Sequence, residues 1–372
     1  MSFGTVLALS AALHLYIGAR LVPVLPAIAG VPLALVLLAS AVLVPAGLLA
    51  RRLLRPPAAD RVTWIGMLCM GWFSTLLVLT VLRDLLLLAG AAFGPWPPAL
   101  VEDSAIAAAA LSFALTAIGF FNARRTARVN TVRIALPDLP AALAGFRIVQ
   151  ISDIHVGPTI KQDYLQAIVD RVNALQPDVV AVTGDLVDGS VAELAPHVAP
   201  LGQLRARHGV FFVTGNHEYY SGVHGWVLEL QRLGLRVLHN EHVVLQHGDA
   251  RLVLAGVPDY SGHHFDPAHR SDPAQALAGA PAGVPRVLLA HQPRTAAAAA
   301  EAGFDLQLSG HTHGGQFFPW SFFVPLQQPF TAGLHKLGRL QIYVSRGTGY
   351  WGPPKRLGAP SEIAELFLSP EG

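Results

Sequence analysis

Eight polar residues in the C-terminal two-thirds of the sequence each follow a short apolar run, in the patterns D-x-H, G-D-x-x-D, G-N-H-E, a single H and G-H-x-H. They are Asp153, His155, Asp185, Asn216, His217, His291, His311 and His313. Carboxylate, amide oxygen and imidazole groups form the mixed oxygen and nitrogen ligand set of a first-row divalent metal such as Mn, Fe or Zn. The set is too large for one tetrahedral ion and large enough for two ions bridged by a carboxylate. Cys69 is the single cysteine, so a structural zinc finger and a disulfide within the chain are both excluded.

Each motif taken alone is weak, because a single Asp or His at a strand end is more often a cap or a turn residue. Five motifs in this order, each after a strand-like run, are hard to explain by chance. Asp153 and His155 are two residues apart, which places both on one side of an extended chain. His311 and His313 show the same spacing in SGHTHGGQFFP (309–319), where the glycines leave room for ions to approach the backbone.

The elements that must position these residues are short strands. The runs that read as buried strands ending at polar residues are 146–155, 178–188, 209–218, 286–293 and 304–315. Residues 159–176, between the first two runs, have helical periodicity and are followed by Pro177. Strand, helix and strand in this order indicate an α/β unit, in which sites gather beyond the carboxyl ends of the strands. Residues 235–246 and 250–257 are expected to form a hairpin, so we expect two packed sheets flanked by helices.

The order of the five motifs resembles the calcineurin-like metallophosphoesterase family over roughly residues 144–369. With the apolar N-terminal part, GHTHGGQ further resembles the branch of transmembrane proteins with a metallophosphoesterase domain. That branch is similar to enzymes that cleave the pyrophosphate of UDP-2,3-diacylglucosamine in lipid A biosynthesis. The resemblance implies an α/β fold, a four-layer αββα sandwich, after an N-terminal bundle of about four transmembrane helices. Glu218 stands where many members of the family have Asp.

The resemblance also implies a role for each motif residue. The implied metal ligands are Asp153, His155 and His313 for one ion, Asn216, His291 and His311 for a second, and Asp185 for both. His217 would not bind metal but would donate a proton to the leaving group, while a hydroxide that bridges the metals attacks phosphorus. Four further residues are candidates for supporting roles and are equally well explained as turn or cap residues: Ser152, Asp188, Glu218 and Gln316.

The N-terminal third has the composition of a membrane domain. Hydrophobic residues make up 52% of the chain and charged residues 13%, against about 25% charged residues in soluble domains. The four apolar stretches expected to span a membrane are residues 3–19, 24–50, 62–82 and 104–121. Arginines gather between the second and third stretches and after the fourth, which predicts four spans with both chain ends in the cytoplasm. Three spans, or a cleaved signal peptide at residues 1–19, remain alternatives, although no base precedes the first apolar run.

We therefore expect a transmembrane helical region at residues 1–126 and a metallophosphoesterase domain at residues 127–372. Arg83 and Asp84 interrupt the third apolar stretch. An ionisable pair inside a span is a candidate for function, but we favour a span that ends near Leu82 with the pair at the membrane interface.

These features predict a membrane-anchored hydrolase with two metals that cleaves a phosphoester or pyrophosphate bond on a lipid-linked substrate such as UDP-2,3-diacylglucosamine. The alternatives are a general phosphodiesterase or phosphomonoesterase on soluble substrates and a membrane sensor or scaffold. The expected partners are the lipid bilayer and a phosphorylated or lipid-linked small molecule.

The charge and the aromatic content bear on partners and location. Residues 131–372 carry 17 Lys and Arg against 20 Asp and Glu, so no nucleic acid is expected. We expect the domain on the cytoplasmic side of a bacterial-type inner membrane. The uncharged residues 317–330 (FFPWSFFVPLQQPF) are expected to pack inside the domain, with contact to the membrane surface or to an acyl chain as alternatives.

Overall fold

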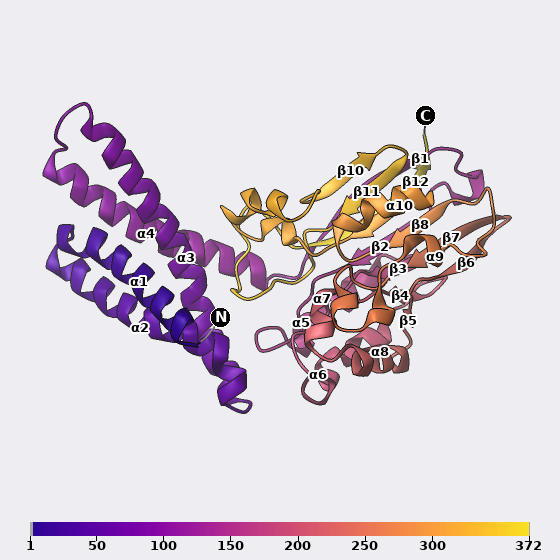
Figure 1. The fold of residues 1–372 in the computed structure, drawn as a ribbon, viewed down its shortest axis with the longest axis horizontal. Coiled ribbons are helices and arrows are strands. Elements are labelled where there is room, and N and C mark those ends of the chain that lie inside the picture. The colour runs from indigo at the N-terminus through magenta and orange to yellow at the C-terminus, as the bar shows by residue number, and fades with distance from the viewer. Residues whose placement is uncertain (1–2, 372) are drawn as a thin grey trace. The chain divides into compact units, whose positions relative to one another are not determined.

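The computed structural model describes residues 3–371 (Figure 1). The chain divides into two compact units. The helical unit comprises the residues up to Arg124 together with Gly352–Leu357, and the α/β unit comprises Arg125–Trp351 and the residues from Gly358 onward. The chain therefore passes from one unit to the other three times.

Four long helices form most of the helical unit. They are α1 (Phe3–Leu21), α2 (Ala27–Leu53), α3 (Ala58–Ala91) and α4 (Pro98–Arg124). Each is long and apolar enough to cross a membrane, which confirms the prediction of four apolar N-terminal helices. Helices α2 and α3 approach closely where two glycines meet, because a Cβ on Gly66 would lie 2.6 Å from the Cα of Gly47.

Arg83 and Asp84 lie inside α3, so the expected end of the span at this pair is not an end of the helix. The buried Arg83 donates a hydrogen bond to the Ser104 hydroxyl of α4 (2.9 Å). Asp84 accepts hydrogen bonds from Tyr16 (2.7 Å) and Arg20 (2.7 Å) of α1. Both charges are paired, and they tie three helices of the unit together.

A short segment from the C-terminal part of the chain also belongs to the helical unit. Residues 352–357 pack with α3 and α4, and Lys355 is only 1% exposed. Its ammonium group donates hydrogen bonds to the Gly71 carbonyl (3.0 Å), the Thr116 hydroxyl (3.2 Å) and the Thr75 hydroxyl. The three ammonium hydrogens thus match three acceptors, which satisfies the buried charge inside the unit.

Two six-stranded sheets form the centre of the α/β unit (Figure 1). The strands are β1 (Arg128–Leu136), β2 (Arg147–Ile151), β3 (Val179–Val182), β4 (Val210–Phe212), β5 (Arg236–Val237), β6 (Glu241–His247), β7 (Ala250–Gly256), β8 (Arg286–Leu289), β9 (Leu306–Ser309), β10 (Gly333–Leu337), β11 (Leu340–Val344) and β12 (Glu362–Pro370). The first sheet has the order β1-β12-β2-β3-β4-β5 and the second has the order β10-β11-β9-β8-β7-β6.

The strand pairing decides where the polar residues end up. Strands β2, β3 and β4 are parallel neighbours in the first sheet, and β7, β8 and β9 are parallel neighbours in the second. The carboxyl ends of these strands therefore lie at a common edge of each sheet. The five predicted strand runs each contain one strand, namely β2, β3, β4, β8 and β9 in chain order. The predicted hairpin is the antiparallel pair β6 and β7.

An extensive apolar core lies between the two sheets. It joins residues of the first sheet such as Ile148 and Phe211 with residues of the second sheet such as Leu252 and Leu306. Strands buried on both faces are typical of parallel sheets covered by helices. The helices of this unit are α5 (Gln162–Ala174), α6 (Val191–Val198), α7 (Asn216–Tyr220), α8 (Val223–Arg232), α9 (Pro273–Ala276) and α10 (Ala296–Ala302).

The helices complete the layers on the outer side of each sheet. Helix α5 buries one apolar face, which includes Leu165 and Ile168. A separate apolar cluster joins Ala276 of α9 and Ala299 of α10 to the second sheet, for example to Ile342. The result is helix, sheet, sheet, helix, which confirms the predicted αββα architecture.

Candidate metal centre

The polar motif residues come together at the carboxyl edge of the two sheets. Asp153 follows β2, Asp185 follows β3 and Asn216 follows β4. His291 and His311 follow β8 and β9 in the other sheet. Since these strands are parallel to their neighbours, their polar ends converge, and they form two groups of side chains that each combine residues from both sheets.

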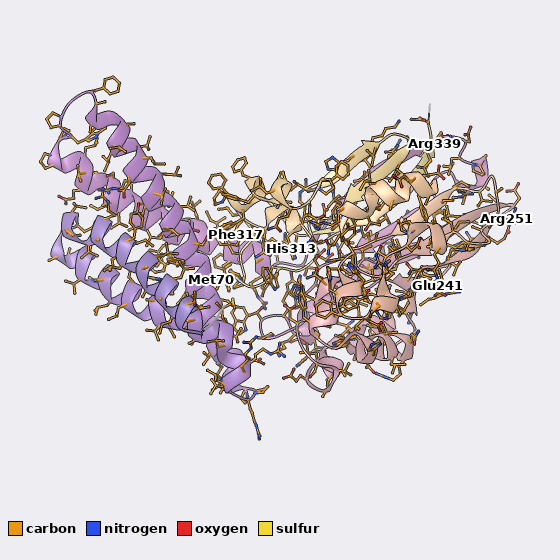
Figure 2. The ribbon with its side chains drawn as sticks, in the orientation of Figure 1. Met70, Glu241, Arg251, His313, Phe317 and Arg339 are labelled. Carbon is orange, nitrogen blue, oxygen red and sulfur yellow. The ribbon has the colours of Figure 1, made fainter. Side chains whose placement is uncertain are left out.

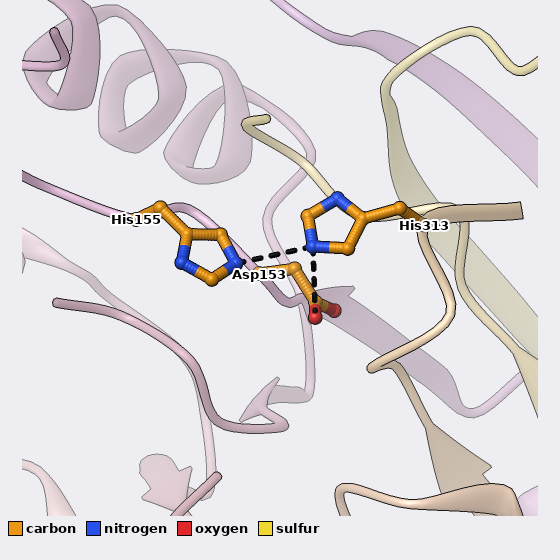
Figure 3. A group of neighbouring side chains, drawn as sticks. All are labelled: Asp153, His155 and His313. Carbon is orange, nitrogen blue, oxygen red and sulfur yellow. Dashed lines mark hydrogen bonds and ion pairs between the residues drawn. The ribbon is translucent and has the colours of Figure 1, made fainter. Parts of the chain in front are cut away.

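The first group consists of Asp153, His155 and His313, all buried (Figure 3). The Nε2 atoms of the two histidines are 3.1 Å apart. Nε2 of His313 is 3.5 Å from Oδ1 of Asp153. The three possible ligand atoms lie within 4.8 Å of one another, as ligands of one ion do.

The second group consists of Asp185, His291 and His311, with Asn216 beside them. Nε2 of His291 is 3.2 Å from Oδ2 of Asp185 and 3.2 Å from Nδ1 of His311. Oδ1 of Asn216 is buried and has no hydrogen-bond partner among the described residues. The same Oδ2 of Asp185 is 3.9 Å from His155 of the first group, so Asp185 borders both groups.

The spacing and the tautomers of these side chains fit bound divalent ions. Ligand atoms about 2.0–2.2 Å from a metal lie about 3–3.5 Å apart, and the closest nitrogen pairs here are 3.1 and 3.2 Å apart. His155 uses Nδ1 for a hydrogen bond to Asp188 (3.1 Å), and His291 uses Nδ1 for the Thr183 carbonyl (2.7 Å). Their Nε2 atoms are left for another partner and point at a second imidazole nitrogen. Two lone pairs at this separation repel each other unless a proton or a cation lies between them.

The pKa shifts of the buried groups also indicate that a positive charge is stabilised at this site. Burial lowers the pKa of His291, but the carboxylates of Asp185 and Asp153 outweigh it and raise that pKa well above its usual value. Burial raises the pKa of Asp185, yet His291 and His217 hold it well below its usual range. Burial and the charge of His291 lower the pKa of His311 to about 3. A proton shared by these groups carries the charge that divalent ions would supply, so the residues fit a metal centre.

Five of the motif residues have a strained backbone. Asp153, His155, Asp185, His311 and His313 have φ values of 54°, 58°, 54°, 71° and 51°, a left-handed conformation that costs about 1–2 kcal/mol for each non-glycine residue. The expectation that the D-x-H and H-x-H pairs lie on an extended chain is therefore wrong. Left-handed turns therefore hold these side chains in their groups at the ends of the strands, and such strain is typical of functional sites.

Comparisons with known proteins agree with this geometry. Residues 146–315 match the family described as Calcineurin-like phosphoesterase. The Bos taurus "Transmembrane protein with metallophosphoesterase domain" is 42% identical over 266 residues, which are 68% of this chain and 60% of that protein. An "Uncharacterized metallophosphoesterase" of Helicobacter pylori is 40% identical and covers 68% of this chain and 67% of its own length. Another, of Aquifex aeolicus, is 33% identical and covers 66% of this chain and 93% of its own length.

The chain belongs to the calcineurin-like metallophosphoesterase family. This confirms the resemblance seen in the motifs. The match spans about 60% of the length of the Bos taurus and Danio rerio relatives. What the chain has in common with all of them is the metallophosphoesterase domain, which is the fold of metal-dependent phosphoester hydrolases.

Asp188 of this metallophosphoesterase orients two histidines, a role that its sequence position left open. Its Oδ1 atom accepts hydrogen bonds from Nδ1 of His155 (3.1 Å) and Nδ1 of His217 (2.6 Å). Both imidazoles are thereby held with Nε2 directed into the site. Burial lowers the pKa of His217, but Asp185 and Asp188 outweigh it and raise that pKa to about 9. His217 is thus charged at neutral pH and lies 3.9 Å from Asp185, next to the metal groups.

Glu218 fixes the backbone from which Asp185 projects. Its carboxylate is fully buried and accepts hydrogen bonds from the amides of Asp185 (3.0 Å), Leu186 (2.7 Å) and Gly215 (2.7 Å). Burial and the charge of Asp185 raise the pKa of Glu218 to about 8, against the three amides, which favour the carboxylate. The role of Glu218 in the G-N-H-E motif is therefore structural. Its side chain, longer than that of the Asp found in many family members, reaches the loop after β3.

The two other residues with open roles, Ser152 and Gln316, also hold loops in place. The Ser152 hydroxyl donates to the Thr183 carbonyl (3.2 Å). The Gln316 side chain makes two hydrogen bonds to the backbone of Trp351, each 2.8 Å long. Arg346, in the loop after β11, pairs with Glu362 (3.2 Å).

Aromatic residues around His217 are the part of the site that the motifs did not reveal. The rings of Tyr220 and Trp351 lie 5.2 and 5.6 Å from the His217 ring, measured between centroids. Both side chains are more than half exposed. Tyr220 is the second residue after the G-N-H-E motif and could have been noticed, whereas Trp351 is more than a hundred residues away and no local pattern marks it.

Proposed function

We propose that this chain is a membrane-anchored phosphoesterase that uses two divalent metal ions. The observation that carries the proposal is the pair of neighbouring ligand groups with Asp185 at their border and His217 next to Asp185. The proposed ligands are Asp153, His155 and His313 for one ion, Asn216, His291 and His311 for the other, and Asp185 for both. The described residues offer carboxylates, an amide and imidazoles at this site and no thiolate, which suits Mn, Fe or Zn.

The side chains of the protein would divide the work between binding and proton transfer. Two ions bound at these groups would offset the charge of a phosphoryl group and activate a water for attack on phosphorus. Asp188 keeps the proton of His217 on Nδ1 and leaves Nε2 directed into the site. The hydrogen bond to the carboxylate of Asp188 favours the protonated imidazole of His217, whose Nε2 proton could then pass to the departing oxygen.

For the substrate, we propose a lipid-linked phosphoester or pyrophosphate such as UDP-2,3-diacylglucosamine, whose hydrolysis is a step of lipid A biosynthesis. Residues 1–126 would anchor the protein and residues 127–372 would carry out the hydrolysis. The four apolar helices support an anchor in the membrane. The arginines at 51, 52, 55 and 61 and after α4 favour a cytoplasmic position for the domain in a bacterial-type inner membrane.

The experiment that tests the proposal is an assay of purified full-length protein in detergent with Mn²⁺ and a UDP-linked lipid. We expect release of UMP, and no release from the Asp185→Asn variant. Activity on soluble aryl phosphoesters alone would favour a general phosphodiesterase or phosphomonoesterase. Absence of hydrolysis of any phosphoester by metal-loaded protein would favour a membrane sensor or scaffold.

A further inference from the structure

A run of apolar side chains next to the metal centre is exposed rather than packed. Residues 317–326, here called the aromatic loop, contain the short helical turns η8 (Trp320–Phe322) and η9 (Val324–Leu326). Its exposed large side chains, from 45% to 80% accessible, are Phe318, Trp320, Phe322, Phe323 and Leu326. The structure does not pack them inside the α/β unit, which was the expectation from the sequence.

The composition of the aromatic loop indicates which kind of surface it contacts. Residues 317–330 contain no charged side chain. Soluble proteins seldom expose a contiguous apolar patch, and such patches mark sites of contact with a partner or a membrane. Tryptophan in particular is enriched at the boundary between lipid and water. The chain itself carries four helices able to span a bilayer, so the α/β unit is tethered to any membrane that these helices cross.

The aromatic loop is fixed to the metal centre at its first residues. Phe317 lies close to His313 (Figure 2), and a Cβ on Gly315 would lie 2.2 Å from the Cα of Ser321. The φ of Gly315 is +79°, so the chain turns back on itself directly after the metal-binding motif. The loop therefore cannot move far from His313 without unfolding this turn.

A cationic side chain borders the other end of the aromatic loop. Arg294 donates a hydrogen bond to the Gln327 carbonyl, and its guanidinium lies 5.3 Å from the centre of the Tyr260 ring. Arg294 is exposed and follows the candidate ligand His291 closely in the chain. An exposed guanidinium beside an apolar patch matches the phosphate of a lipid headgroup, with its acyl chains on the apolar side.

We propose that the aromatic loop inserts into the interface of the phospholipid bilayer and brings the metal centre to phosphate groups at the membrane surface. The occupant of the exposed patch is the bilayer itself. This inference deepens the proposed function, on which it rests for the nature of the substrate, since it restricts that substrate to a phosphoester presented from the membrane.

The test measures the depth of one loop residue in the full-length protein. A nitroxide label is attached to Phe322→Cys in a Cys69→Ser background, and the protein is reconstituted in vesicles of phosphatidylcholine and phosphatidylglycerol. Collision of the label with oxygen and with a water-soluble nickel complex is measured by power saturation. Glu241→Cys is the matched control, because Glu241 is exposed on β6 and lies far from Phe317 in the α/β unit (Figure 2).

We expect the ratio of oxygen to nickel collisions to be several-fold higher at position 322 than at position 241. Equal ratios at the two positions would overturn the proposal, because the loop would then be in water. A label at 322 that neither reagent reaches would also overturn it, because the loop would then be covered by protein. The measurement needs no substrate, so an inserted loop in a protein without phosphoesterase activity would remove the proposed function and leave the insertion standing.

A second pair of variants tests the consequence for catalysis. Phe322→Ser combined with Phe323→Ser should raise the KM for a lipid substrate in vesicles several-fold and leave kcat/KM for a soluble aryl phosphodiester unchanged. Leu228→Ser is the control, because Leu228 is similarly exposed on α8 outside the aromatic loop. An equal loss on both substrates would contradict the role of the loop, since it would indicate damage to the metal centre.

Discussion

Two substitutions of Asp188 distinguish the effect of its negative charge on the site from the effect of its hydrogen bonds. A single oxygen of Asp188 accepts the Nδ1 protons of His155 (3.1 Å) and His217 (2.6 Å). Burial raises the pKa of this carboxyl, but the two imidazoles hold it well below its usual range, so Asp188 is ionised at any working pH. Asp188→Asn can keep the oxygen in place and removes the charge, whereas Asp188→Ala removes the acceptor.

The magnitudes follow from the kind of hydrogen bond that is lost. A hydrogen bond to a charged partner contributes about 1.5–3 kcal/mol and a neutral one about 0.5–1.5 kcal/mol. Asp188→Asn should therefore weaken the hydrogen bond to each imidazole by about 1–1.5 kcal/mol. This corresponds to a roughly tenfold lower ratio of correctly oriented to misoriented rings. Asp188→Ala frees the imidazole of His155 to adopt the other tautomer, and loss of such a partner typically lowers metal affinity by about 10–100-fold.

The same substitution should change the pH dependence of turnover. A general acid works in its protonated form, so the contribution of His217 is complete at low pH and is lost as pH rises through its pKa of about 9. The charge of Asp188 is one of the causes that raise this pKa, and bound cations lower it. We therefore expect an alkaline limb at or below pH 9 in the wild-type protein and a shift of that limb to lower pH in Asp188→Asn.

The assay combines metal content after dialysis against a weak chelator with kcat/KM for aryl phosphodiesters over a range of pH. Asp163→Asn is the control, because Asp163 is an exposed carboxylate on α5 outside the site. If Asp188→Ala retains the metal content, turnover and pH profile of the wild-type protein, Asp188 does not orient the two histidines and the reasoning fails.

Three further substitutions test other parts of the site. Asp185→Asn should lose both ions and all activity, and metal analysis that finds two ions per chain would contradict its place between the two groups. His217→Ala should keep both ions and lose about 10²–10⁴-fold in turnover on substrates with poor leaving groups; an equal loss on good leaving groups would argue against proton donation. Glu218→Gln places an NH₂ group against a backbone amide and should lower the free energy of unfolding by about 3 kcal/mol, measured by denaturant titration; a change within about 0.5 kcal/mol would mean that the amides find other acceptors.

The residues that we propose as metal ligands could be selected from the sequence because each belongs to a local pattern. Asp185 and His291 each follow an apolar run that forms a strand, and the end of a strand in a parallel sheet is a predictable place for a site. The conformation of these ends was not predictable. Asp153 and His313 adopt left-handed φ values, which Asp and His adopt more often than most residues but still uncommonly, so no local pattern marks where they occur.

The supporting residues could not be identified because their partners are distant in the chain or because their local role looked ordinary. Asp188 and Glu218 were both reasonable turn or cap residues until the structure placed Asp188 between two histidines and Glu218 under the loop after β3. Trp351 reaches His217 from a distant part of the sequence. The same holds for Lys355 in the fold. A charged residue near the C-terminus would be assigned to the surface, but acceptors on α3 and α4 satisfy its buried ammonium group.

The segment 352–357 also limits how the protein can be divided. A single proteolytic cut after Arg124 would not separate the two units, because the chain crosses between them again on both sides of this segment. A shortened protein that begins at Arg125 would carry Lys355 without its acceptors Thr75 and Thr116, and would leave those hydroxyls behind. A soluble version of the α/β unit therefore needs a second change, in which a short polar turn joins Trp351 to Gly358, so that β12 can still enter the first sheet between β1 and β2.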